Sequence, residues 1–249
     1  MKKIISRDQF EEILNSNASE MAKDEELINE ALKIKVKAGY DYFWVHQTKW
    51  FGEPILNLPQ DLFAIQEIIY ATKPKYFIEV GTAWGGGLLF YSTLMEILGG
   101  EKVIGVDIFI PDDLKDRINK HGSISNRIKW VEGSSTNKKT ITRIKEIIGD
   151  SRDVMVLLDS HHTHKHVYKE LNMYSELVGK GNYLICGDTV IEHQPRSDKR
   201  PREWGVGNNP QTALNQFLVE SDRFQIDHDI SNKLLFTCNP GGYLKAIKD

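Results

Sequence analysis

Apolar and polar residues follow two different periods from residue 60 onward. Segments with apolar residues three or four positions apart, typical of helices packed by one face, are separated by short apolar runs of strand length. The expected helices cover residues 61–70, 85–98, 111–120, 136–148, 163–178 and 210–219. The expected strands cover residues 76–80, 102–107, 127–131, 154–158, 183–186, 224–228 and 234–237. This alternation predicts an α/β fold with an open, mostly parallel sheet and helices on both faces.

Two features indicate how this sheet is arranged. The run at 154–158 is Val-Met-Val-Leu-Leu, and a strand that is apolar on both faces is typical of the centre of a parallel sheet. The last two expected strands, 224–228 and 234–237, are joined too closely for a crossover helix. We therefore expect them to pair antiparallel, which makes the final strand a reversed strand at the edge of the sheet.

The first 59 residues depart from this pattern. Residues 1–39 are predicted to be helical, and an aromatic cluster follows. The cluster consists of Tyr40, Tyr42, Phe43, Trp44, Trp50 and Phe51. Such a cluster is typical of a lid or a subunit contact, and equally of side chains that cover the core of their own domain. We expect an N-terminal helical and aromatic extension at 1–59 and a separate α/β domain at 60–249.

Composition and charge narrow the range of partners. The 249 residues include 32 basic and 35 acidic side chains, so the net charge of −3 does not favour nucleic acid as a partner. No apolar run reaches the roughly 20 residues that span a bilayer, and the N-terminus has no secretory pattern. We therefore expect a cytoplasmic protein without a membrane span. Cys186 and Cys238 lie in apolar runs and are expected to be reduced core residues.

A glycine-rich loop follows the first expected strand, with the sequence Ile-Glu-Val-Gly-Thr-Ala-Trp-Gly-Gly-Gly at 78–87. Its glycine spacing does not match the G-x-G-x-x-G pattern of dinucleotide sites. Glu79 would repel a pyrophosphate but could pair with a cationic ligand, which favours S-adenosylmethionine with its ammonium and sulfonium groups. A plain strand-to-helix turn is the alternative. The candidate cofactor residues here are Glu79, Gly81, Thr82, Gly85 and Gly86.

The next two strand ends carry further candidates for cofactor binding. Asp107 ends the second strand, where a carboxylate can accept hydrogen bonds from both hydroxyls of a ribose. Gly133, Ser134 and Ser135 follow the third strand, and their small side chains fit the edge of an adenine ring. Ser135 could equally cap the following helix.

Acidic and histidine side chains follow the fourth and fifth strands. Four of the eight histidines lie at positions 161–166, directly after Asp159. Asp159 and Asp188 end neighbouring strands and could share a Mg²⁺ ion, although both could instead cap turns or helices. His162 and His166 share one helical face, a spacing that by itself only suggests a metal site. The loop at 191–209 contains Glu192, His193, Arg196, Lys199, Arg200, Arg202 and Trp204, and is either a lid or a solvated basic loop.

Together these motifs resemble the cephalosporin hydroxylase-like family, which is grouped with rhamnosyl and related O-methyltransferases. The resemblance covers about residues 40 to 245 and is carried by the combination of motifs. The matching motifs are Trp50-Phe51-Gly52-Glu53-Pro54-Ile55, Pro59-Gln60-Asp61-Leu62, Glu67-Ile68-Ile69, Lys73-Pro74, the loop at 79–87, Glu132-Gly133-Ser134-Ser135, Asp159-Ser160-x-His162-x-x-x-His166-Val167 and Asn239-Pro240-Gly241-Gly242-Tyr243-Leu244.

The resemblance implies a Rossmann-like methyltransferase fold, S-adenosylmethionine as cofactor, often a magnesium ion, and assembly as a homo-oligomer. One position departs from the family pattern. The family tends to have an acidic metal ligand directly before the aspartate after the fifth strand, and this chain has Gly187 there. The metal site would then keep Asp159 and Asp188, with Glu192 or His162 as a substitute ligand, or it would be empty.

We therefore expect an S-adenosylmethionine-dependent O-methyltransferase, with or without magnesium, that acts on a hydroxyl of a sugar or other small molecule. His162 is the candidate base because histidine titrates near neutral pH, and His161 and His193 are alternatives. Asp159 and Asp188 would orient the acceptor hydroxyl. Two other hypotheses stay open at this point: a nicotinamide-dependent oxidoreductase on a Rossmann sheet, and a non-catalytic cofactor-binding protein.

Overall fold

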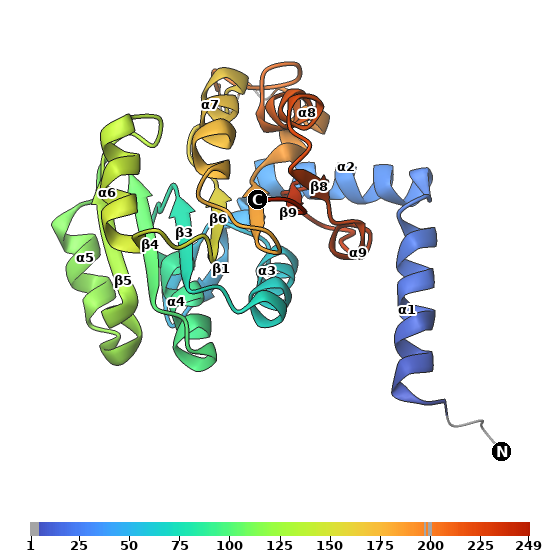
Figure 1. Ribbon diagram of the computed structural model, residues 1–249. Helices are drawn as coiled ribbons and strands as arrows, with labels where there is room; N and C mark the ends of the chain where they lie inside the picture. The colour runs from blue at the N-terminus through green and yellow to red at the C-terminus, as the bar shows by residue number, and fades with distance from the viewer. Residues whose placement is uncertain (1–4, 197, 199–200) are drawn as a thin grey trace.

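A seven-stranded sheet forms the centre of the computed structural model, which describes residues 5–196, 198 and 201–249 (Figure 1). Its strands are β3 (Tyr76–Val80), β4 (Lys102–Asp107), β5 (Ile128–Glu132), β6 (Val154–Leu158), β7 (Tyr183–Cys186), β8 (Phe224–Ile226) and β9 (Tyr243–Ala246). Their order across the sheet is β5-β4-β3-β6-β7-β9-β8, and β3 to β7 are parallel. The predicted α/β fold and the central position of β6 are confirmed, and β6 lies between β3 and β7.

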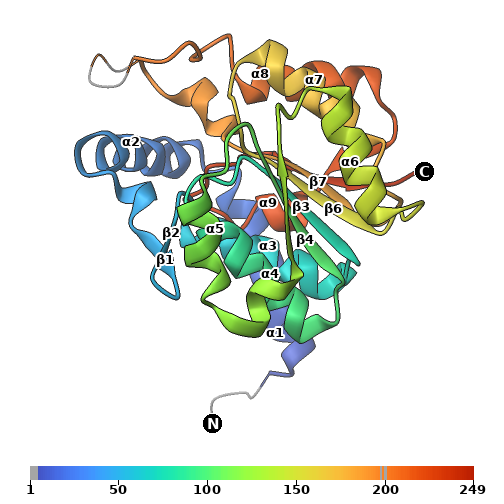
Figure 2. The same ribbon diagram turned by 90° about the vertical axis from the view of Figure 1, so that its left-hand side faces the viewer.

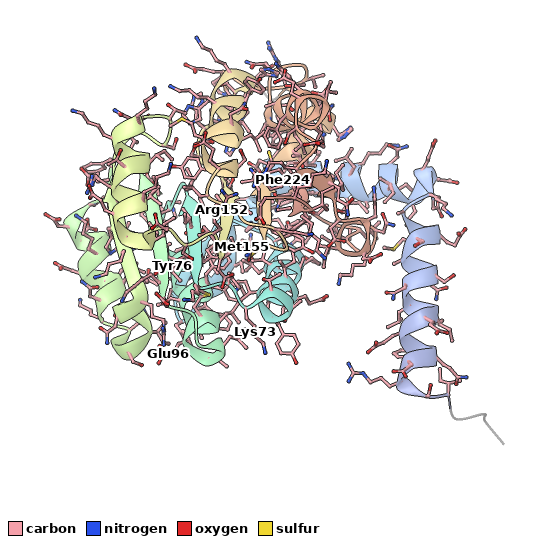
Figure 3. The ribbon with its side chains drawn as sticks, in the orientation of Figure 1. Lys73, Tyr76, Glu96, Arg152, Met155 and Phe224 are labelled. Atoms are coloured by element: carbon pink, nitrogen blue, oxygen red, sulfur yellow. The ribbon has the colours of Figure 1, made fainter. Side chains whose placement is uncertain are left out.

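Helices cover both faces of this sheet (Figure 2). One face packs against α3 (Pro59–Thr72), α4 (Gly86–Leu98) and α5 (Asp112–Asn119), and the other against α6 (Lys138–Ile148), α7 (His164–Ser175) and α8 (Pro210–Glu220). Successive side chains of a strand point to opposite faces, so Met155 packs with α3 and α4 whereas Val156 packs with α7. Figure 3 shows Met155 within this packed interior. Two short helical turns, η2 (Gly122–Arg127) and η3 (Thr189–His193), lie in the connections.

The prediction for the end of the chain was wrong in two respects. Residues 234–237 form no strand, and the last strand is β9, which pairs antiparallel with both β7 and β8. The reversed strand therefore lies inside the sheet, and β8 is the edge. A short helix, α9 (His228–Ser231), follows β8.

A buried carboxylate anchors the segment between residues 234–237 and β9. Asp61 on α3 is fully buried and accepts hydrogen bonds from the Thr237 hydroxyl, the Cys238 amide (2.8 Å) and the Tyr243 hydroxyl (2.8 Å). Asp61 thus connects α3 to the chain on both sides of the turn that precedes β9.

The N-terminal segment consists of α1 (Arg7–Met21), α2 (Glu25–Tyr42), the turn η1 (Trp44–His46) and a hairpin of β1 (Thr48–Trp50) and β2 (Glu53–Ile55). Ser6 begins α1 with a capping box in which it exchanges hydrogen bonds with Gln9. No side chain of α1 is buried, and the helix leads away from the sheet (Figure 3). None of the helices in the described ranges is long and apolar enough to cross a membrane.

The β1–β2 hairpin packs onto α4. The Trp50 indole N–H donates to the Thr93 hydroxyl (3.0 Å), and its ring meets Phe90 edge-on with 5.1 Å between centroids. A side chain at Gly86 would overlap the carbonyl oxygen of Pro54, so only glycine allows this approach. Part of the aromatic cluster therefore covers the core of its own domain, while Tyr42 and Phe51 are exposed. Cys186 and Cys238 are buried and unpaired, as predicted.

The contact at Gly86 can be tested by adding one methyl group. We expect Gly86→Ala to destabilise the protein by about 1–3 kcal/mol, the usual cost of overpacking, because the hairpin must move away from α4. Gly39→Ala in α2 is the control, since no atom of the described residues outside its own helical turn lies within 4 Å of the added carbon, and we expect it to stabilise by about 0.5–1 kcal/mol. Urea unfolding measures both changes. Equal stabilities for the two variants would contradict the close contact.

Candidate active site

A cavity of about 1020 Å³ lies at the carboxyl ends of the parallel strands. The strand register places Val80, Val106, Leu158 and Cys186 level with one another. The residues that follow these four positions therefore meet at one edge of the sheet. In open α/β sheets, ligands bind beyond this edge, where neighbouring strands lead into connections on opposite faces.

Glu79 lies at the closed end of the cavity. Glu79 is only 7% exposed, and its Oε2 atom has no hydrogen-bond partner among the described residues. A side chain at Gly87 would overlap the Glu79 carboxylate, so this glycine makes room for it at the start of α4. Burial raises the pKa of Glu79 well above its usual value, and the carboxylates of Asp159 and Asp107 add to this effect. A buried carboxylate with one oxygen left without a partner beside a cavity is suited to a cationic or hydroxyl-bearing ligand.

Some residues of the predicted glycine loop line the cavity, and others pack against the protein interior. Gly81 and Thr82 line the cavity, and Gly81 has a φ of 93° with no room for a side chain against the Asp159 backbone. Gly85 and Gly86 are not among the lining residues. Gly85 begins α4 in a left-handed conformation and packs against Leu114 and Ile118. The glycine pattern therefore reports close packing as much as the approach of a ligand.

Asp107 joins this loop to the end of β4. Its Oδ2 atom accepts hydrogen bonds from the Thr82 amide (2.9 Å) and hydroxyl (3.2 Å). The Phe109 amide lies 3.4 Å from Oδ1. Asp107 lines the cavity, so it can also accept from a ligand.

The turn after β5 contributes Ser134, Ser135 and Thr136 to the cavity wall, whereas Gly133 is not a lining residue. Ser135 is 7% exposed, and its hydroxyl contacts His166 Nε2 at 3.1 Å. The alternative that Ser135 caps the following helix is wrong, because Asn137 caps α6.

Asp159, His162 and Asp188 form the one group with metal-binding geometry that the described residues contain. One ligand atom from each lies within 4.8 Å of the other two, and His162 Nε2 is 3.5 Å from Asp188 Oδ2. Asp188 has the left-handed conformation (φ 53°), which is unfavourable for residues other than glycine. Its amide donates to the Asn239 side chain (2.9 Å), which holds it in this conformation.

The structure places His162, rather than Glu192, beside the two aspartates. Glu192 accepts hydrogen bonds from the Gly207 amide (2.8 Å) and the Asn209 side chain, within its own loop. A side chain at Gly187 would come within 2.8 Å of the Leu158 carbonyl oxygen and 3.0 Å of Asp159 Oδ1. The backbone as it stands thus has no room for a further carboxylate at Gly187.

Electrostatics in this cluster favour cations. Burial raises the pKa of Asp159 well above its usual value, and the Asp188 carboxylate raises it further. Burial also lowers the pKa of His162, and this effect outweighs the attraction of Asp188. His162 is therefore neutral at neutral pH and can accept a proton or bind a metal ion.

Residues of the predicted lid lie over the histidines. Trp204 meets His161 and His162 edge-on, with ring centroids 5.2 and 5.0 Å apart, and Arg202 lies over the Trp204 ring. His161 is more exposed and lies 3.5 Å from Glu203. The loop lines the cavity with Arg196, Arg202 and Trp204, whereas His193 does not. Lys199 and Arg200 lie outside the described residues.

Sequence reasoning missed the contribution of α2 to the cavity. Lys35 is 4% exposed and lines the wall, together with Val36, Gly39 and Tyr40. The signal was present, because Lys35 follows Ala31 by four residues and so lies on the buried face of α2. The Tyr40 hydroxyl also donates to the Pro195 carbonyl (2.8 Å), which connects α2 to the loop above the histidines.

Comparison with known proteins agrees with this geometry. The model of the family described as rhamnosyl O-methyltransferase/CmcI matches residues 42–247. The chain belongs to this family. It is 26% identical over 207 residues to the rhamnosyl O-methyltransferase of Mycobacterium tuberculosis, covering 80% of this chain and 78% of that one. It is 28% identical over 209 residues to the Mycobacterium leprae protein of the same name, covering 82% and 86%.

Solved structures confirm the expected fold. CmcI without ligand superposes with a TM-score of 0.57 at 18% identity, covering 81% of this chain and 77% of CmcI. CmcI with magnesium and S-adenosylmethionine gives a TM-score of 0.56 at 17% identity, covering 80% and 76%. The match to this family confirms the resemblance seen in the sequence, and the superposition confirms the Rossmann-like methyltransferase fold.

The raised pKa of Glu79 predicts how stability depends on pH. Below pH 4.5 the carboxyl group is protonated in both the folded and unfolded states, so its titration does not lower the free energy of unfolding. As the pH rises from 4.5 towards the raised pKa, the unfolded state loses its proton while the folded state keeps it, so the free energy of unfolding of the ligand-free protein falls. Glu79→Gln should remove this part of the fall and leave a flatter profile of melting temperature between pH 4.5 and 8. Parallel profiles for the two proteins would contradict the assignment.

Proposed function

We propose that this protein transfers a methyl group from S-adenosylmethionine to a hydroxyl group of a sugar or other small molecule. The observation that carries the proposal is the group of three carboxylates, Glu79, Asp159 and Asp188, that line one large cavity in a chain of this family. S-adenosylmethionine brings a sulfonium and an ammonium group, so its charge complements this set.

The cofactor residues are proposed from their positions. Glu79, Gly81 and Thr82, at the end of β3, line the cavity together with Asp107, Ser134 and Ser135. Asp107 is proposed to bind the ribose, and Ser134 and Ser135 the adenine. Gly85, Gly86 and Gly133 are proposed to act indirectly, because they shape the loops without lining the cavity. Asp159 belongs to the metal group and also lines the cavity next to the cofactor residues, so it is proposed to contact both the metal ion and the cofactor.

Asp159 and Asp188 are proposed to hold Mg²⁺, a hard ion that prefers oxygen ligands. When bound, the ion would lower the pKa of an acceptor hydroxyl. His162 then removes the proton from that hydroxyl, because it is neutral and adjacent to Asp188. The remaining residues position the acceptor oxygen in line with the methyl group, which accounts for much of the rate in such displacements. Trp204 and His161 shield this position from water.

The two alternative functions have less support. The glycine spacing and Glu79 disfavour a nicotinamide cofactor, whose pyrophosphate would lie against a carboxylate. A non-catalytic cofactor-binding protein would bind S-adenosylmethionine without transferring its methyl group. A panel of sugar and phenol acceptors, assayed with radiolabelled S-adenosylmethionine and Mg²⁺, tests the proposal. Binding without transfer to any acceptor would favour the non-catalytic alternative.

The roles of His162 and the aspartates can be separated by kinetics. His162→Ala should lower kcat by about 100-fold or more, the usual contribution of a general base, while the Mg²⁺ concentration for half-activation stays unchanged. Asp188→Asn should instead raise that Mg²⁺ concentration. If His162→Ala also raises it, His162 is a metal ligand and cannot be the base. An unchanged kcat in His162→Ala would exclude both roles.

We also propose that the protein is a homo-oligomer in which α1 packs against a second copy of the chain. A solitary 15-residue helix is marginally stable in water, yet α1 buries none of its side chains and exposes Phe10, Ile13 and Leu14 on one face. Self-association of this stripe would bury it in a symmetric contact. The division into an extension at 1–59 and a domain at 60–249, and a cytoplasmic location, stay predictions.

Charged substitutions in α1 test this assembly. Phe10→Glu combined with Leu14→Glu should shift the mass measured by light scattering from that of an oligomer to that of a smaller species. Glu11→Gln combined with Glu12→Gln, on the polar side of the same helix, is the control and should leave the mass unchanged. A wild-type mass of 28.5 kDa, that of one chain, would contradict the proposal.

A further inference from the structure

A polar cluster connects three segments at the wall of the cavity, and its members are different residues from those of the proposed metal group. His166 Nε2 lies 3.1 Å from Ser135 Oγ, 3.3 Å from Ser160 Oγ and 3.1 Å from Glu170 Oε1. The Ser160 hydroxyl also donates to Glu170 Oε1 at 2.6 Å. Ser135 follows β5, Ser160 follows β6, and the other two residues lie on α7. Ser135, Ser160 and His166 line the cavity, and Glu170 lies behind them.

The position of Glu170 indicates that this cluster does more than stabilise the fold. The residue is fully buried, and its Oε2 atom has no hydrogen-bond partner. Burying a carboxylate with an unsatisfied oxygen costs free energy, and a well-packed apolar side chain at this position would avoid that cost. What Glu170 provides is a fixed acceptor for His166 and Ser160.

This acceptor determines where the imidazole proton lies. A carboxylate can only accept hydrogen bonds, so the Nε2 atom that faces Glu170 carries a hydrogen. The same nitrogen faces Ser135, and it therefore cannot accept the Ser135 proton. The one Nε2 hydrogen is shared between Glu170 and the serine oxygens around it, and the Ser135 O–H group is directed elsewhere. Within the described residues, His166 is the only hydrogen-bond partner of this hydroxyl. The Ser135 proton is thus available to a ligand in the cavity.

We propose that His166, held by Glu170, is a positioning residue that makes Ser135 a hydrogen-bond donor to a ring nitrogen of the cofactor's adenine. This inference rests on the proposed function, because the adenine belongs to S-adenosylmethionine. The ring nitrogens of adenine accept hydrogen bonds, whereas its amino group donates them. The Ser135 O–H, which His166 cannot accept, needs an acceptor in the cavity, and a ring nitrogen offers one whereas the amino group does not. His166 itself takes no part in methyl transfer.

Calorimetry with S-adenosylhomocysteine and its deaza analogues, each with one ring nitrogen replaced by carbon, tests the inference. Ser135→Ala should weaken binding of S-adenosylhomocysteine about tenfold, a typical value for one buried hydrogen bond. For one of the analogues, which lacks the nitrogen that Ser135 recognises, the same substitution should change nothing. His166→Leu should show the same dependence on the analogue, and His166→Gln, whose amide can donate to Ser135, should restore binding.

His164→Leu is the matched control. His164 is on the same helix and contacts Thr212 (2.9 Å) and Gln216 (3.0 Å), but it does not line the cavity. Its removal should leave the affinity for S-adenosylhomocysteine unchanged. For His166→Leu, kcat at saturating S-adenosylmethionine should stay near the wild-type value while KM for the cofactor rises.

The outcomes separate the inference from the proposed function. If the folded wild-type protein binds no S-adenosylhomocysteine, the proposed function fails. If the wild type binds but Ser135→Ala weakens every analogue equally, Ser135 donates to no ring nitrogen and the inference is overturned. Equal weakening of all analogues by His166→Leu would likewise reduce His166 to a structural role. Ser135→Ala removes only one hydroxyl and should fold. Its result therefore tests whether Ser135 donates to a ring nitrogen even if His166→Leu does not fold.

Discussion

Carboxylates that lie close together in a protein interior raise one another's pKa, and each is costly unless a cation or a hydrogen-bond donor neutralises it. In this protein the strand register brings Glu79 and Asp159 to the same edge of the sheet, and Asp188 follows one strand further along. The pKa values of Glu79 and Asp159 are both raised, first by burial and then by neighbouring acids. Much of the surrounding structure serves to keep these groups in place.

Contacts from distant parts of the sequence hold these carboxylates in position. Asn239 holds Asp188 in its left-handed conformation, and the turn that carries Asn239 is fixed through Thr237 and Cys238 by the buried Asp61. Glycines at positions 81 and 87 allow the loop after β3 to pass close to Asp159 and Glu79. A cation at this edge would relieve the repulsion that these contacts maintain. The site is thus arranged in advance for a positively charged ligand.

The sequence predicted the sheet well because its central strands carry strong signals. The strands at 76–80, 102–107, 154–158 and 183–186 were predicted with the bounds that the structure has. The error at 234–237 arose because a short apolar run does not distinguish a strand from an irregular segment, and the contacts with Asp61 that hold this segment are far away in the sequence. The site was predicted through the residues that follow the strands. The spacing of Lys35 from Ala31 already indicated the buried face of α2, whereas the contributions of Ser160 and Glu170 depend on how α7 packs, which no local pattern records.

The central claim is that Asp159 and Asp188 bind a divalent cation next to S-adenosylmethionine. A crystal grown with Mn²⁺ and S-adenosylhomocysteine, with data collected at the manganese absorption edge, tests it most directly. We predict one strong anomalous peak coordinated by Asp159 and Asp188, with the adenine beside Ser135 and the ribose beside Asp107. A cavity that holds the cofactor in this place with no anomalous peak at the aspartates would contradict the claim.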